Sequence, residues 1–141
     1  MKRTIAEISA GCIVYTYIDE AIHILVLKNS TNRWGFAKGR IEPDEALYDC
    51  AIRETQEETG INDITLHPKF HHMYTEKKEF ETEISFKTTH LFLTKTTQSV
   101  KISSEHIDFA WVKPDKALEL LHSPNQKAAL QEALAVLNKD Y

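Results

Sequence analysis

The stretch GRIEPDEALYDCAIRETQEETGI, from Gly39 to Ile61, decides the fold. Pro43 and Asp44 predict that a helix begins early in this stretch, and Gly60 predicts its end. At about 100° per residue, a set of apolar and acidic positions falls within one third of the helix circumference. These positions are Leu47, Cys50, Ala51, Glu54, Glu57 and Glu58. The predicted helix face therefore begins apolar and ends in three carboxylates.

Three carboxylates this close repel one another unless a cation lies among them. Carboxylate oxygens are hard ligands, and no Cys or His lies among the three glutamates in residues 54–58. Mg²⁺, with Mn²⁺ as a possible substitute, fits such ligands better than zinc does. The alternative interpretation of a bare ExxEE pattern is a solvated acidic face that closes an ordinary helix.

A longer pattern decides between these two interpretations. The spacing of Gly39, Glu45, the Arg53-Glu54 pair, the Glu57-Glu58 pair and Gly60-Ile61 resembles the signature of the Nudix hydrolases over all 23 residues. Thr55 departs from it, because the family usually has an aliphatic residue there. The resemblance implies an α+β fold: an α/β/α sandwich with a central mixed β-sheet, a catalytic loop-helix-loop and C-terminal helices.

The resemblance also implies roles for individual residues. Glu54, Glu57 and Glu58 match the metal ligands of the family, the backbone carbonyl near Gly39 matches an additional ligand, and one of the glutamates is a candidate general base. Arg53 is expected to orient a carboxylate through charge-assisted hydrogen bonds.

Residues outside the helix complete the predicted site. Lys38 matches a basic position of the family, and together with Arg40 it is expected to bind phosphate oxygens. Glu105, in a later loop, is a candidate further metal ligand or base. With metal ions bound there, the expected chemistry is hydrolysis of a phosphoanhydride, because such ions neutralise the substrate, activate water and stabilise the leaving phosphate.

Length and composition bound the rest of the chain. Its 141 residues, 42% hydrophobic and 27% charged, predict a single domain over residues 1–141. The net charge of −4 argues against a protein that binds duplex nucleic acid. Cys12 and Cys50 lie in apolar contexts without CxxC spacing and are expected to be buried thiols. The longest apolar run, Ile24 to Leu27, is too short to cross a bilayer, so we expect a soluble cytoplasmic protein, monomeric or homodimeric.

The remaining segments predict strands and two helices. Strands are expected at residues 5–17, 21–28, 84–95 and 107–113, extended chain at 62–67 and 69–75, and a charged hairpin or loop at 76–83. Alternation in the third strand places Lys87 on the same face as Leu91, either at an edge or in a pocket that holds an anion. The helices that begin after Pro114 and Pro124 are expected to be scaffold only.

Four segments together indicate the branch of the family. The segments WGFAKGRIEPDE, KTTHLFLTK, SSEH and NQKAALQEAL resemble the asymmetrical dinucleoside tetraphosphatases. That resemblance implies hydrolysis of diadenosine tetraphosphate to ATP and AMP, with Lys87 at the phosphate chain and Tyr74 at an adenine. An exposed ring of Tyr74 would suffice for stacking on a base.

Other functions remain open at this stage. Within the family the alternatives are removal of pyrophosphate from RNA 5′ ends, hydrolysis of nucleoside triphosphates and cleavage of diphosphoinositol phosphates. The last would favour a highly basic channel, whereas the Lys and Arg residues here are scattered. The alternative outside enzymes is a Nudix-fold sensor that binds a nucleotide without hydrolysing it, which would have no chemical need for the full carboxylate set.

Overall fold

The computed structural model describes residues 1–139. Its sheet is built around one long strand, β1 (Arg3–Ile18). β1 pairs in parallel with β6 (Glu83–Lys95) along one edge. Along its other edge it pairs antiparallel with β4 (Ala37–Arg40) and then with β2 (Ala21–Asn29). The sheet is therefore mixed, as predicted.

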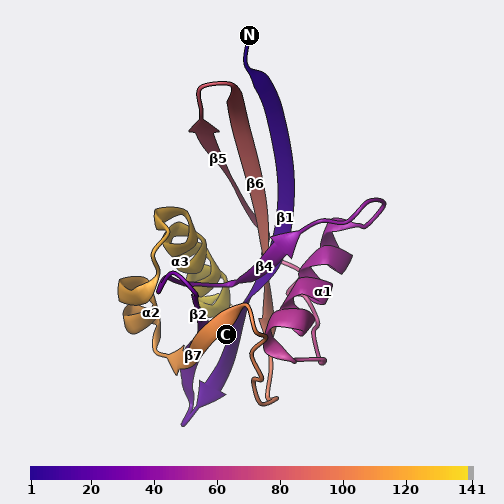
Figure 1. Ribbon diagram of the computed structural model, residues 1–141. Coiled ribbons are helices and arrows are strands. Elements are labelled where there is room, and N and C mark those ends of the chain that lie inside the picture. Colours follow the sequence, from indigo (N-terminus) through magenta and orange to yellow (C-terminus); the bar gives the residue numbers. More distant parts are fainter. Residues whose placement is uncertain (140–141) are drawn as a thin grey trace.

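The outer strands attach to β2 and β6. β2 pairs with β3 (Trp34–Gly35) and with β7 (His106–Val112), and β5 (His72–Glu79) pairs with β6. The described residues form one seven-stranded sheet. Residues 76–83, predicted as a charged hairpin or loop, form the end of the β5–β6 hairpin. With the start of β1 this hairpin extends as a narrow ribbon away from the helices (Figure 1).

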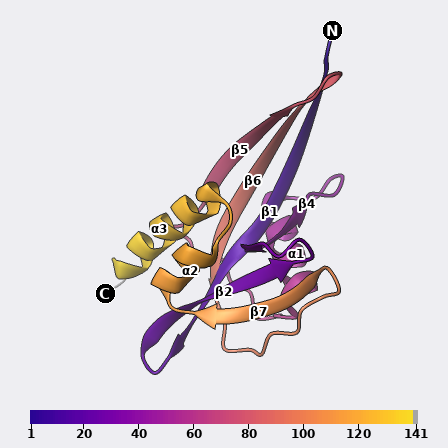
Figure 2. The ribbon, with the colours of Figure 1, turned by 60° about the vertical axis from the view of Figure 1, so that its left-hand side comes forward.

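Helices cover both faces of the sheet (Figure 2). Ile13 and Tyr15 of β1 belong to the core beneath α2 (Pro114–Leu120) and α3 (Pro124–Asn138). Cys12 and Val14 point to the opposite face, where they join the core beneath α1 (Leu47–Thr59). This alternation along one strand produces the predicted three layers.

Helix α1, the predicted catalytic helix, begins at Leu47, which is later than expected. Pro43 and Asp44 do not open it, because Asp44 adopts a left-handed φ of 63° and the chain makes a turn before Leu47. The Glu45 carboxylate closes this turn by accepting a hydrogen bond of 3.0 Å from the Glu42 N–H. The predicted end is confirmed, since Gly60 caps the helix at a φ of 72°.

Most predicted strands are confirmed to within a few residues. Residues 62–67 form no strand, and their only ladder contact is an isolated bridge between Leu66 and Thr94. The start of α3 is capped by the Ser123 Oγ, which accepts a hydrogen bond of 3.2 Å from the Gln126 N–H. Among residues 1–139, the structure contains no helix with the length and apolar character needed to span a membrane.

Candidate active site

Helix α1 turns two of its three glutamates toward the sheet. Cys50 and Ala51 are fully buried, and Glu58, two turns later, is only 4% exposed. The side chain of Glu54 is 14% exposed, whereas that of Glu57 is 58% exposed. The face that changes from apolar to acidic therefore exists, with Glu57 at its solvent edge.

Arg53 gathers the acids around this helix. Its Nε and Nη2 donate to the two carboxylate oxygens of Glu45 at 2.7 and 2.9 Å. Its Nη1 donates to Glu54 at 2.9 Å and to Glu57 at 3.3 Å, and its Nη2 also donates to the Arg40 carbonyl at 3.1 Å. These bonds from Arg53 lower the pKa of Glu45 to about 2. The arginine thus orients carboxylates, as expected.

Gly39 leaves the space that Glu54 occupies. A Cβ on Gly39 would stand 1.8 Å from Oε2 of Glu54, which is far inside van der Waals contact. The Gly39 carbonyl also accepts a long hydrogen bond of 3.6 Å from the Cys50 thiol. A side chain at this position would therefore displace the Glu54 carboxylate.

Glu58 and Lys38 are charged groups in largely buried positions. Burial, followed by the nearby charge of Glu54, raises the pKa of Glu58, although the Lys38 backbone N–H hydrogen bonds to it. Burial, followed by the nearby charge of Lys87, lowers the pKa of Lys38. The His106 Nε2 lies 3.6 Å from Oε1 of Glu58. Both groups therefore favour a ligand that supplies compensating charge.

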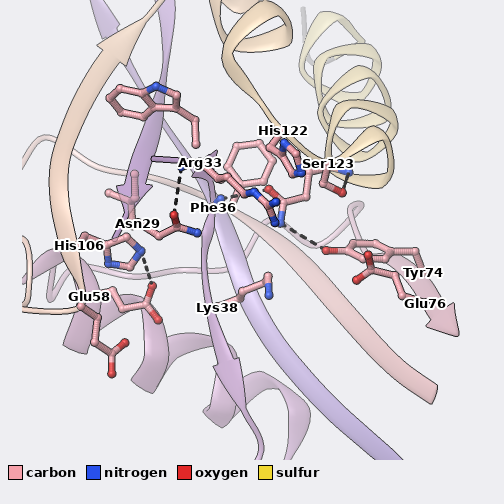
Figure 3. A pocket seen from close by; sticks show the side chains of 15 residues that line it. Asn29, Arg33, Phe36, Lys38, Glu58, Tyr74, Glu76, His106, His122 and Ser123 are labelled. Carbon is pink, nitrogen blue, oxygen red and sulfur yellow. Dashed lines mark hydrogen bonds and ion pairs between the residues drawn. The ribbon is translucent and has the colours of Figure 1, made fainter. Parts of the chain in front are cut away.

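A cavity of about 360 Å³ opens beside these groups. Figure 3 shows the Lys38 side chain between Glu58 on one side and Tyr74 with Glu76 on the other. The lining comes from β2 and the turn after it, from β3, β4, α1, β5 and the start of β7, and from the corner between α2 and α3 with the first turn of α3. It consists of Leu27, Asn29, Arg33, Trp34, Gly35, Phe36, Lys38, Glu58, Tyr74, Glu76, Glu105, His106, His122, Ser123 and Gln126.

Four of the predicted site residues line the cavity, namely Lys38, Glu58, Tyr74 and Glu105. The others lie outside its lining: Gly39, Arg40, Arg53, Glu54, Glu57 and Lys87. The Arg40 side chain is 70% exposed and pairs with Glu7 at 2.9 Å. As a phosphate ligand Arg40 is therefore poorly placed. Arg40 lies two residues beyond Lys38 on β4, which places it about 7 Å farther along the strand.

Tyr74 and Lys87 also differ from expectation. Tyr74 is only 8% exposed and its ring belongs to the core, so the open ring face assumed for stacking is absent; its hydroxyl meets the Gln126 amide at 3.4 Å. Lys87 lies on the face of Leu91, as predicted, in register with Glu7 and Glu76 on the neighbouring strands. It stands next to Lys38 rather than in the lining of the cavity.

Sequence reasoning missed several lining residues. The C-terminal helices were expected to be scaffold only, which was wrong, because His122, Ser123 and Gln126 line the cavity. A signal for Gln126 was present: it precedes Leu130 by four residues and so lies on the apolar stripe of α3, where a polar side chain needs a partner. Its Oε1 accepts a hydrogen bond of 3.3 Å from the Phe36 N–H.

The comparison with known families agrees with this geometry. A family model described as the NUDIX domain matches residues 7–133. The chain belongs to the Nudix family. It is a Nudix hydrolase that acts on phosphoric anhydrides.

Relatives of this Nudix protein carry different names. The asymmetrical bis(5′-nucleosyl)-tetraphosphatase of Sus scrofa is 32% identical over 123 residues, which cover 79% of this chain and 78% of that protein. The dihydroneopterin triphosphate diphosphatase of Haemophilus influenzae is 29% identical over 138 residues, covering 90% and 87%. A crystal structure of a C. elegans Ap4A hydrolase binary complex superposes with a TM-score of 0.80 at 25% identity, covering 94% of this chain and 98% of that one.

Nudix hydrolases generally use divalent metal ions, and the acids of α1 fit such an ion. Glu54, Glu57, Glu58 and the Gly39 carbonyl offer oxygen donors only, the set that hard divalent cations prefer. Within residues 1–139 no group of three or more His, Cys, Asp or Glu side chains is already arranged as a metal cage. Arg53 holds Glu54 and Glu57 beside each other through hydrogen bonds of 2.9 and 3.3 Å.

Replacement of Gly39 by alanine should disturb the site through Glu54. We expect Gly39→Ala to fold and to lose about 10- to 100-fold in divalent-cation affinity or in kcat/KM, because the added methyl displaces the Glu54 carboxylate. Calorimetric metal titration and steady-state kinetics would measure both. The double variant with Glu54→Ala should be no worse than Glu54→Ala alone; fully additive losses would contradict the mechanism.

Glu45→Gln should remove a pH-dependent part of the stability. The pKa of Glu45 is depressed from 4.5 to about 2, so its contribution is complete above pH 4.5 and is lost as the pH falls toward 2. We therefore expect the variant to be less stable than the wild type at neutral pH, with the gap closing between about pH 5 and 2. Urea unfolding over this range measures the gap, and a constant gap would contradict the ion-pair explanation.

Proposed function

We propose that the protein hydrolyses dinucleoside tetraphosphates with Mg²⁺, converting diadenosine tetraphosphate and water to ATP and AMP. The observation that carries the proposal is the cavity that brings a buried glutamate of α1, the Lys38 ammonium and the aromatic residues Trp34 and Tyr74 into one lining. A carboxylate suits a metal ion bound to the polyphosphate, an ammonium suits the phosphate oxygens, and an aromatic surface suits the nucleobase. The names of the Sus scrofa and C. elegans relatives support this substrate class.

The metal would be held by α1 and the strand before it. Glu54, Glu57 and Glu58 are the proposed ligands, with the Gly39 carbonyl as a further donor. When bound, a divalent cation supplies neutralisation of the phosphate oxygens and acidification of the attacking water. Arg53 keeps Glu54 and Glu57 on one side of the helix by hydrogen bonds of 2.9 and 3.3 Å, which limits the reorganisation needed for binding.

Two lysines are proposed to hold the phosphate chain. Lys38 points into the cavity from β4, and Lys87 of β6 adds a second positive charge next to it, so that a phosphate chain would relieve the repulsion between the two. Glu105 is exposed at the same cavity, close enough to Glu58 to raise its pKa. In the proposed step, water attacks phosphorus, the anhydride P–O bond breaks, and the Glu105 carboxylate takes the proton that water releases.

The nucleoside is proposed to lie at the end of the cavity formed by Trp34, Tyr74, His122 and Gln126. The buried ring of Tyr74 offers its edge and hydroxyl rather than an open face. Gln126 fixes this end, since its amide contacts both Tyr74 and the backbone of Phe36. Such fixed polar groups give base selectivity through hydrogen bonds, which reject ligands that leave them unpaired.

A second candidate within the family is hydrolysis of a nucleoside or pterin triphosphate. Its support is the Haemophilus influenzae relative, whose similarity spans 90% of this chain. The RNA 5′ end is a third candidate, because it presents the same triphosphate to the same lysines. A nucleotide sensor without activity is the least favoured, since it would not need the complete set of carboxylates.

A substrate panel tests the proposal. The protein would be incubated with Mg²⁺ and, separately, diadenosine tetraphosphate, nucleoside triphosphates, dihydroneopterin triphosphate and 5′-triphosphorylated RNA, and the products separated by chromatography. We expect the highest kcat/KM for diadenosine tetraphosphate, with ATP and AMP in equal amounts. Preference for another substrate would overturn the substrate assignment, and two molecules of ADP would overturn the position of cleavage.

Glu57→Gln should separate activity from folding. Glu57 is half exposed, and the amide keeps its volume, so we expect normal folding together with loss of most activity. Asp49→Asn is the matched control, because it removes one charge from an exposed position of the same helix; its kcat/KM should stay within about twofold of the wild type. Equal activity in the wild type and Glu57→Gln would show that this acid is not a ligand.

A further inference from the structure

A second cavity, of about 420 Å³, lies beside the first turn of α1. It shares no lining residue with the first cavity. Its lining comes from α1, from the segment between α1 and β5, and from β6: Tyr48, Leu66, His67, Pro68, Lys69, Phe70, His71 and Phe92. Its volume is in the range of small-molecule sites, about 300–1,000 Å³.

Aromatic rings dominate the wall of this cavity. His71 stacks on Phe92 with ring centroids 4.6 Å apart and an interplanar angle of 21°, and Tyr48 tilts against the same Phe92 at 5.0 Å. Phe92 is buried and holds both rings in place, whereas Tyr48 is 59% exposed. An exposed aromatic ring beside a rigid aromatic wall offers a stacking surface for a flat ligand.

A buried anchor fixes the orientation of the His71 ring. Its Nε2 lies 2.8 Å from Nδ1 of His90, which is buried in β6. With one nitrogen engaged in this way and one ring face against Phe92, the opposite face of His71 is held in a defined position. The wall is therefore preorganised, which reduces the entropy lost on binding.

The charges of the two cavities differ. The first cavity mixes the acids Glu58, Glu76 and Glu105 with basic residues, whereas the lining of the second contains no acid and includes Lys69 and two histidines. In a chain of net charge −4, a ring-walled cavity with basic residues and no acid favours an anionic aromatic ligand.

We infer that this second cavity is a binding site for a purine mononucleotide, separate from the site of hydrolysis. The base stacks against Tyr48 and His71, and Lys69 contacts the phosphate. The inference rests on the chemistry of this cavity and does not depend on the substrate proposed for the first one.

AMP is a suitable probe, because it contains no phosphoric anhydride and is not consumed. In NMR titrations of the wild-type protein with Mg²⁺, we expect AMP to shift the amides of Tyr48 and residues 66–71, with weaker effects from adenosine and inorganic phosphate. Shifts confined to residues 33–38 and 122–126, around the first cavity, would overturn the inference.

Variants identify the contacts. Tyr48→Ala should weaken AMP binding at the second cavity about fivefold or more, while Tyr48→Phe keeps the ring and the affinity. Lys69→Glu should also weaken it, whereas Lys116→Glu, the same charge change on α2 at the opposite face of the sheet, should not. Wild-type affinity at residues 66–71 in both Tyr48→Ala and Lys69→Glu would overturn the assignment.

Discussion

The bidentate ion pair between Arg53 and Glu45 is the interaction on which the arrangement of the active site depends. Exposed ion pairs contribute little to stability, but a bidentate arginine-carboxylate pair with low exposure fixes geometry as well as charge. Here the side chains are 24% and 13% exposed. Glu45 also accepts the Glu42 N–H, so a single carboxylate joins the turn after β4 to the middle of α1.

This link matters because the start of α1 lacks a side-chain cap. Glu45 acts together with the Arg53 Nη2 bond to the Arg40 carbonyl, at 3.1 Å, and the Cys50 thiol bond to the Gly39 carbonyl, at 3.6 Å, to hold the chain around Gly39 against α1. In this arrangement, the Glu54 carboxylate fits into the space that the missing side chain of Gly39 leaves open. The glycine and the two charged residues therefore act as one unit, although fourteen positions separate Gly39 from Arg53 along the chain.

The sequence predicts the acids of α1 and the orienting role of Arg53 because their determinants are local, whereas the pairing of Arg53 with Glu45 was not predicted. Helical periodicity places Glu54 and Glu58 on the face of Cys50 and Ala51, and glycine at position 60 ends the helix. The helix start was predicted less well, because the Asp44 turn depends on side-chain bonds that periodicity does not describe. Strand alternation likewise placed Lys87 on the correct face without showing that Glu7 and Glu76 flank it.

The parts that could not be predicted depend on contacts between distant segments. The burial of Tyr74 follows from the packing of α3 on β5, and the direction of Arg40 follows from the register that brings Glu7 beside it. Neither has a periodic signature.

The same difference between local and long-range contacts separates the residues proposed to carry out hydrolysis from those proposed to select the substrate. The three acids that are proposed to bind metal all come from α1, whereas most of the cavity wall is assembled from β2, β3, β4, β5, β7 and the corner between α2 and α3. A substitution on β5 or at the corner between α2 and α3 changes the space for a base at positions that make no contact with Glu54 or Glu58. A change confined to such a wall would leave the acids of α1 in place, which fits relatives at 32% and 29% identity whose names give different substrates.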